Sequence, residues 1–184
     1  RSVSRGLGDV YKRQGMGVSA VVGAFENVVA ILPIVICFQS LILDMAGNVG
    51  TQSLAVTIRV LMDEELAPKD KLKLVLKEAK VGFSNGFLLG ILAIVFLGLY
   101  IFLYKGYDIR HAFLISLCVG VSLLLAMIVS SLVGTLVPLF FKKIKVDPAV
   151  ASGPLITTVN DLVAVVIYYG LSWVFLIQTM HILG

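Results

Sequence analysis

The stretch Val81–Tyr104, VGFSNGFLLGILAIVFLGLYIFLY, holds no charged residue and is long enough to cross a membrane as a helix. Similar apolar runs recur along the chain, which is 59% hydrophobic and 14% charged, with a mean hydropathy of +1.01. This composition argues against a water-soluble core and predicts an integral membrane protein. The runs lack the two-residue alternation of a membrane β-barrel, so the expected fold class is all-α, a polytopic bundle of membrane helices.

Four complete spans and one partial span are expected. The complete spans are predicted over residues 28–50, 81–104, 112–141 and 149–183, while residues 15–24 are apolar but too short to cross a bilayer. The polar residues 62–80 have helical character, and we expect them to lie as a solvated helix on the membrane surface. We interpret residues 1–14, RSVSRGLGDVYKRQ, as a foreign flank, with a genuine cytoplasmic arm as the alternative. The membrane domain is therefore predicted over residues 15–184.

Basic residues concentrate in two of the predicted connections. Lys and Arg in short loops are retained on the cytoplasmic side of a membrane. The loop between the third and fourth spans holds only Lys105 and Arg110, so we expect it outside the cell together with the C-terminus. The predicted location is the plasma (inner) membrane. The nine basic residues of the two cytoplasmic connections are Arg59, Lys69, Lys71, Lys73, Lys77, Lys80, Lys142, Lys143 and Lys145.

The net charge of +4 is thus mostly a signal of topology, and no basic face of a nucleic-acid-binding domain is visible. Both cysteines, Cys37 and Cys118, fall in apolar runs and are expected to be buried structural thiols. His111 and His181 are expected near the membrane edges. The chain offers no Cys–His cluster that would suit zinc.

Two carboxylates fall inside predicted spans, Asp44 and Asp161. Placing a carboxylate within a span costs about 2.5–3.5 kcal/mol, so such groups usually face a bundle interior or an aqueous path. Because no predicted span contains a Lys or Arg, the two acids must be protonated, hydrogen-bonded or balanced by a cation. Hard divalent cations prefer oxygen ligands, and Mg²⁺ keeps most of its water while it touches one or two carboxylates.

Polar residues accompany both acids. Ser40, Asp44, Asn48 and Gln52 follow one another at i, i+4 and predict a polar line along one helix. Thr157, Thr158 and Asn160 surround the second acid. These groups form a predicted wet cation path, although Asn48 and Gln52 could instead hydrogen-bond helices together without an ion.

Glycines and prolines lie close to both acids. Gly47 and Gly50 flank Asn48 and would let a neighbouring helix approach closely or let the helix unwind. Asp147 followed by Pro148 predicts the start of the last helix. Asp161 is then expected about 20 Å along that helix, near the middle of the membrane.

Two stretches of this sequence resemble a known family. DMAGNVGTQSLAVTIR, residues 44–59, is similar to the second-helix signature of MgtE-type magnesium transporters, and VDPAVASGPLITTVNDLVAVVIYYGL, residues 146–171, resembles their fifth helix. The charged connector LAPKDKLKLVLKEAKVGF follows the first stretch, as it does in that family. The resemblance covers roughly residues 15–183.

The resemblance implies a homodimeric, channel-like transporter for Mg²⁺ with five membrane helices per subunit, the first shortened here. Its pore would lie between the subunits, lined by the second and fifth helices, with Asp161 as the ion-binding carboxylate. Two departures are visible: some members have Asn where this chain has Gly153, and others have a small or polar residue at the position of Asp44. The pore-lining candidates are Asp44, Asn48, Gln52, Thr157 and Asn160.

The family also carries cytoplasmic regulatory domains ahead of its first span, so this chain is expected to be the membrane domain alone. A contact between residues 62–80 and such domains is the alternative to a surface helix. The expected partners are a second copy of the chain, the lipid bilayer and the transported Mg²⁺, with no nucleic acid and no resident cofactor.

Two further functions fit the residues less well. A proton-coupled secondary transporter could use Asp44 and Asp161 as proton relays. An intramembrane aspartyl protease needs a GxGD motif on a membrane helix, but residues 158–161 read TVND, and the GLGD of residues 6–9 lies in the polar flank. We therefore expect a transporter and not an enzyme.

Overall fold

The computed structural model describes residues 16–26, 30, 33–63, 66–151 and 154–179. All regular secondary structure in these residues is helical and none is strand, which confirms the predicted all-α class. Among the described residues, four helices are long and apolar enough to cross a membrane. The long helices are α3 (Ile34–Asp63), α4 (Pro68–Lys105), α5 (Ile109–Lys143) and α6 (Pro154–Leu171).

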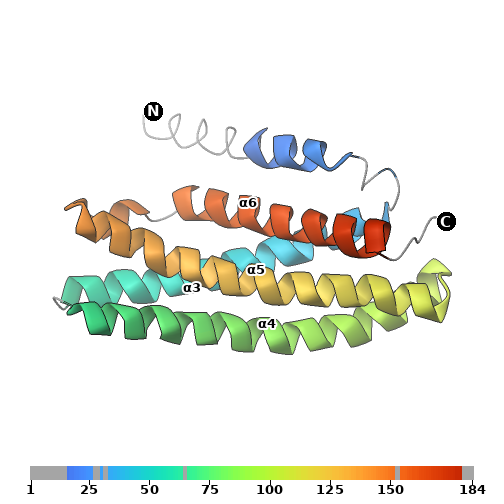
Figure 1. Cartoon of the computed structure of the whole chain (residues 1–184), viewed down its shortest axis with the longest axis horizontal. Coiled ribbons are helices and arrows are strands. Elements are labelled where there is room, and N and C mark those ends of the chain that lie inside the picture. Colours follow the sequence, from blue (N-terminus) through green and yellow to red (C-terminus); the bar gives the residue numbers. More distant parts are fainter. Residues whose placement is uncertain (1–15, 27–29, 31–32, 64–65, 152–153, 180–184) are drawn as a thin grey trace, which may run out of the picture.

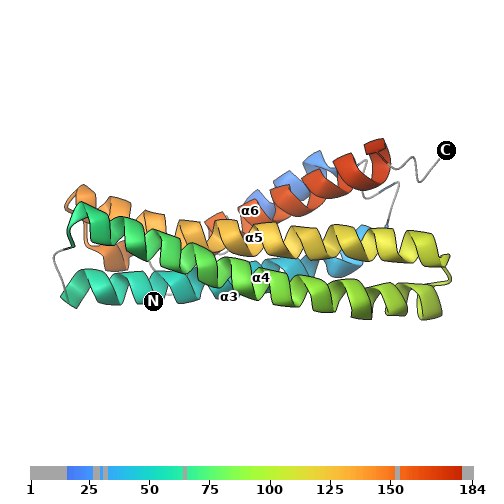
Figure 2. The same cartoon turned by 60° about the horizontal axis from the view of Figure 1, so that its bottom comes forward.

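The long helices lie side by side, with α3 and α5 running one way and α4 and α6 the other (Figure 1). Helix α5 is central, because it contacts α3, α4 and α6, whereas α3 and α4 barely touch (Figure 2). A short helix over residues 16–24 precedes them, and the ring of Phe25 stacks on that of Tyr169 with centroids 5.8 Å apart. The polar flank (residues 1–14), Gly153 and His181 lie outside the described residues.

Helix α3 is longer than the sequence indicates. We expected the second span to end at Gly50, but α3 continues without a break to Asp63. Its second half stays helical because Leu54 is buried with Ile156 in a small apolar cluster. Asp44 therefore lies in the interior of α3, and of the two alternatives for the glycines, unwinding does not occur because α3 is continuous at Gly47 and Gly50.

The polar residues 62–80 do not form a separate helix on the membrane surface. Residues 62 and 63 end α3, and from Pro68 onward the chain is already part of α4. Pro68 occupies the first turn, where its missing N–H leaves no helical hydrogen bond unmade. Apolar and polar parts of α4 thus form one continuous helix of 38 residues.

The turn between α4 and α5 is built from local signals. Gly106 ends α4 in the left-handed conformation, with φ at 74°, which suits a residue without a Cβ. Asp108 caps α5 by accepting a hydrogen bond from the His111 N–H at 3.0 Å. That bond from the backbone is the main reason why the pKa of the Asp108 carboxyl lies below its ordinary value.

The last membrane helix begins later than predicted. Asp147 caps only a single 3-10 turn, Pro148–Ala151, by accepting a hydrogen bond from the Ala149 N–H at 2.9 Å. Helix α6 then starts at Pro154 and passes into a π-helical segment, Ser172–Thr179. Asp161 is seven residues after Pro154, so it lies about 10 Å along α6 and not 20 Å.

Helices α4 and α5 pack with their backbones in contact. A Cβ added at Gly86 would lie 2.8 Å from the Cα of Leu124, and one at Gly90 would lie 2.8 Å from the Gly120 carbonyl oxygen. Small residues at these positions let the two helices approach closely. Cys118 of α5 is buried as predicted, whereas Cys37 of α3 is exposed, which corrects that prediction.

Hydrogen bonds tie α3 to its neighbours at both ends. At the end where α3 begins, the hydroxyl of Tyr168 donates to the Val35 carbonyl oxygen at 2.8 Å, and that of Tyr169 donates to Gln39 Oε1 at 2.7 Å. At the other end, Lys142 Nζ donates to the Leu61 carbonyl oxygen at 2.7 Å. The middle of α3 lies between these fixed points.

Candidate ion-binding site

An open hollow with an empty volume of about 500 Å³ lies between the middle of α3 and α6. Both intramembrane acids line it, Asp44 from α3 and Asp161 from α6. The predicted candidates Asn48 and Thr157 line it too, so the structure brings four of the six together. Leu43, Gly47 and Thr51 complete the lining.

The polar groups on this hollow are oxygen donors. Asp44 and Asp161 supply carboxylates, Asn48 an amide oxygen, and Thr157 a hydroxyl. Such oxygens are the ligands that hard divalent cations prefer. Because the hollow is open, it lets an ion approach these oxygens while the ion keeps water around it.

Thr51 is a lining residue that the sequence analysis missed. Its hydroxyl donates to the carbonyl oxygens of Gly47 at 2.9 Å and Asn48 at 3.0 Å. Because the hydroxyl proton is directed to the backbone, the Thr51 oxygen remains an acceptor for water or a cation. The residue therefore adds one more oxygen to the α3 side of the hollow.

Helix geometry explains why Thr51 lines the hollow and Gln52 does not. At 3.6 residues per turn, each step of four residues drifts by about 40°, so Gln52 is turned by about 80° from Asp44. A step of seven residues drifts by only about 20°, which leaves Thr51 almost in line with Asp44. Gln52 is exposed outside the hollow. The spacing i, i+3, i+4, i+7 from Asp44 would have identified four of the five lining residues on α3, all except Leu43.

Asn160 also lies away from the hollow. It is fully buried, with an exposed fraction of 0%, and its amide packs against Gly50 of α3. Its neighbour Asp161 is half-buried and lines the hollow. Adjacent residues on a helix point about 100° apart, so the side chains of Asn160 and Asp161 face different surroundings.

The polar line on α3 is open to the outside of the single chain. Ser40, Asp44, Asn48 and Gln52 are all exposed, and they lie within a helix long and apolar enough to cross the membrane. Polar side chains at such depth usually face a bundle interior or water rather than lipid. This side of α3 is therefore a surface that the isolated chain leaves uncovered.

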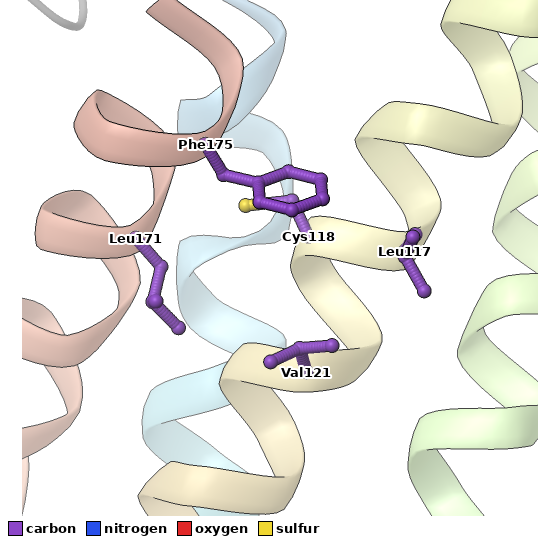
Figure 3. A pocket seen from close by; sticks show the side chains of 5 residues that line it. All are labelled: Leu117, Cys118, Val121, Leu171 and Phe175. Atoms are coloured by element: carbon purple, nitrogen blue, oxygen red, sulfur yellow. The ribbon is translucent and has the colours of Figure 1, made fainter. Parts of the chain in front are cut away.

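A second hollow, between α5 and the last helical segments, has a different character. Its empty volume is about 210 Å³, and the Cys118 Sγ atom beside it lies 3.7 Å from the Ser172 hydroxyl oxygen. Figure 3 shows that apolar side chains and this thiol line it. It offers none of the oxygen ligands of the first hollow. Its lining residues are Leu117, Cys118, Val121, Leu171 and Phe175.

Comparison with known proteins places the chain in a family. A family model described as a divalent cation transporter, MgtE, matches residues 39–171, from the second turn of α3 to the end of α6. The chain belongs to the MgtE family. This confirms the recognition made from the two sequence stretches. The chain is a multi-pass membrane protein, and its family consists of transporters and not of enzymes.

Curated MgtE relatives agree with this assignment. The chain is 34% identical over 162 residues to the magnesium transporter MgtE of Bacillus subtilis and to that of Enterococcus faecalis, covering 88% of this chain and 34% of each relative. It is 32% identical over 158 residues to the magnesium transporter MgtE of Thermus thermophilus, covering 86% of this chain and 33% of that protein. The chain thus spans about a third of the length of these relatives.

Proposed function

We propose that residues 15–184 form the membrane domain of a Mg²⁺ transporter, with residues 1–14 as a flank outside it. Hydrated Mg²⁺ would pass through a pore between two copies of the chain, lined by α3 and α6. The observation that carries this proposal is the hollow that Asp44 of α3 and Asp161 of α6 both line, together with neutral oxygen donors. The names of the relatives, magnesium transporters, support the choice of ion.

Asp161 is the carboxylate that we assign to the ion. It lies on the hollow, half-buried, in a helix whose hydropathy suits a membrane span. A carboxylate in that setting is stabilised by a cation that shares the hollow. Mg²⁺ commonly binds through one or two carboxylates and keeps several waters, which suits an open hollow better than a closed cage. Asp44, on the opposite wall, would add attraction for the same ion.

The uncovered polar side of α3 favours a pore between two copies of the chain. Lipid is a poor neighbour for Asp44, Asn48 and Gln52, because each polar group facing hydrocarbon costs free energy. A second copy placed against this side would enclose the polar line and the hollow together. The resulting path would be wet and lined from both subunits, and Gln52 could then line it although it stays outside the hollow of one chain.

The charged ends of the helices support the direction of the pore. The basic end of α5, with Lys142 and Lys143, and the lysine-rich start of α4 lie at the same end of the bundle (Figure 1). We assign this end to the cytoplasm of the plasma membrane, which places the C-terminus outside. The membrane potential, negative inside, would then drive Mg²⁺ inward.

The first test is the thermal stability of the purified chain across a Mg²⁺ titration, compared with Asp161→Asn. A ligand that binds only the folded state stabilises by RT ln(1 + [L]/Kd), about 2.7 kcal/mol at 100 times Kd. We expect a saturating shift in the native chain and its loss in Asp161→Asn. The matched control is Asp70→Asn, because Asp70 is an exposed acid at the start of α4, paired with Lys73 at 3.0 Å.

Flux into liposomes completes this test. We expect Mg²⁺ entry that follows an imposed membrane potential and that Asp161→Asn reduces by at least about tenfold. Flux that instead follows a pH gradient would favour proton coupling through Asp44 and Asp161. Equal Mg²⁺ stabilisation of the native chain and Asp161→Asn would show that the ion site is assigned wrongly.

A further inference from the structure

Three helices meet behind the hollow at Gly50 of α3, Gly134 of α5 and Asn160 of α6. A Cβ at Gly50 would collide with the side-chain amide of Asn160. A Cβ at Gly134 would collide with the carbonyl oxygen of Gly50. Both glycines are buried, so at this level α5 packs directly on the backbone of α3, and α6 packs on it through the Asn160 side chain.

This contact adjoins both walls of the hollow. Gly50 precedes Thr51 on the α3 wall, and Asn160 precedes Asp161 on the α6 wall. Because Gly134 packs against the carbonyl group of Gly50, α3 cannot shift at this level without disturbing its packing on α5. The thickness of the Asn160 side chain therefore sets how far Asp161 lies from the α3 wall.

Shape, and not hydrogen bonding, holds Asn160 in this position. Its Nδ2 and Oδ1 atoms are both buried and make no hydrogen bond to any part of the chain that the structure describes. A buried amide without partners is unfavourable compared with an apolar group of the same size. What fixes the amide is its fit against a residue that has no side chain.

We propose that Asn160 is a positioning residue for the ion site. Seated on Gly50, it fixes the spacing between α3 and α6 and thus the separation of Asp161 from Asp44 and Asn48. This inference rests on the proposed function, since it concerns the affinity of the same hollow for Mg²⁺. It assigns to Asn160 a role other than lining the pore.

The test is a set of variants in which a side chain added on one helix is offset by one removed from its neighbour, made in the full chain in detergent. The quantity measured is the half-saturating Mg²⁺ concentration, which gives half of the maximal shift in unfolding temperature. Gly50→Ala forces α6 away from α3 and should raise that concentration by about tenfold. Adding Asn160→Ala removes the group with which the new methyl collides. The double variant should therefore return to within about threefold of the native value. A double variant no better than Gly50→Ala would overturn the proposal.

Asn160→Leu separates spacing from amide chemistry. Leu has nearly the same branched shape without polar atoms, so it should keep the half-saturating Mg²⁺ concentration within about threefold of native. It should also raise the unfolding temperature, because the unpaired amide is gone. A loss of affinity in Asn160→Leu as large as in Gly50→Ala would contradict a spacing role.

Two controls make the result specific. Gly90→Ala crowds α4 against the Gly120 carbonyl oxygen, away from the hollow, and should lower the unfolding temperature without changing the half-saturating Mg²⁺ concentration. Asp161→Asn reports on the ion site itself. If Asp161→Asn abolishes the Mg²⁺ shift while Gly50→Ala leaves it unchanged, the ion site stands and the positioning role fails. If Asp161→Asn has no effect, the proposed function fails first.

Discussion

Helices α4 and α5 pack closely against each other, whereas α3 and α6 leave a polar hollow between them. Along α4, Gly82, Gly86 and Gly90 bring backbone against α5, and the outer side of α4 is apolar and exposed. Helices α3 and α6 touch at the hydrogen bond from Tyr168 to Val35 and at Gly50, and a hollow lined by two carboxylates opens between them.

The difference indicates that the two helix contacts have different roles. A close-packed apolar pair is stabilised by dispersion and has few alternative arrangements, so it suits a framework. A pair held apart around polar groups loses that packing, and such a loss is tolerated where a membrane protein needs a wet path. The predictions below test whether the two contacts can be disturbed independently.

The largest effect is expected from Gly86→Val. Its Cβ would lie 2.8 Å from the Cα of Leu124, and a backbone atom cannot turn aside as a flexible side chain can. Overpacking of this kind costs about 1–3 kcal/mol of the free energy of unfolding. Denaturation in detergent measures it. If the half-saturating Mg²⁺ concentration of the protein that remains folded also changed, the two contacts would not be independent of each other.

A smaller effect is expected from Tyr168→Phe, which alters the hydrogen bond between α6 and the first turn of α3. The change removes the hydrogen bond to the Val35 carbonyl oxygen and should lower the free energy of unfolding by about 0.5–1.5 kcal/mol. Tyr104→Phe is the matched control, because its side chain is 78% exposed at the end of α4. Equal losses in both variants would mean that the buried hydrogen bond is not the cause.

The smallest effect is expected from Asp108→Ala, in the turn of the α4 and α5 pair. The His111 N–H lowers the pKa of the Asp108 carboxyl from its ordinary value of 3.8. The ionised cap therefore stabilises the fold at neutral pH, and this contribution is lost as the pH falls from about 3.8 through the lower pKa of the folded state. Unfolding temperatures of the two proteins should converge as the pH is lowered through this range. A gap that is constant with pH would point to a cause other than the charge.

The sequence predicted best what hydrophobic length and charge decide. Helix α5 was expected over residues 112–141 and is observed at Ile109–Lys143, because a polar turn and two lysines bound a nearly unbroken apolar run. The end of α3 was missed because apolar length ends near Gly50 while helical packing on α5 continues. The start of α6 was missed because Asp147 and Pro148 form an N-terminal signal that serves only a single turn.

The sequence predicted the candidate site only in part as well. Residue types indicated oxygen donors around two acids, and Asp44 and Asp161 do share one hollow. Helical spacing from Asp44 would have favoured Thr51 over Gln52, but the choice between Asn160 and Asp161 depends on the angle at which α6 faces α3. Neighbouring positions differ by about 100° around a helix, and tertiary packing alone decides which of them turns inward.

The length of α4 has a mechanical consequence. Its 38 residues extend about 57 Å, against about 30 Å of hydrocarbon, so one rigid rod joins the membrane to the water beyond its basic end. A tilt of about 10° would carry the far end of that rod through an arc of about 10 Å. Because Gly86 and Gly90 bring the backbone of α4 against α5, such a tilt would carry α5 along with α4, and the two helices would move as one unit.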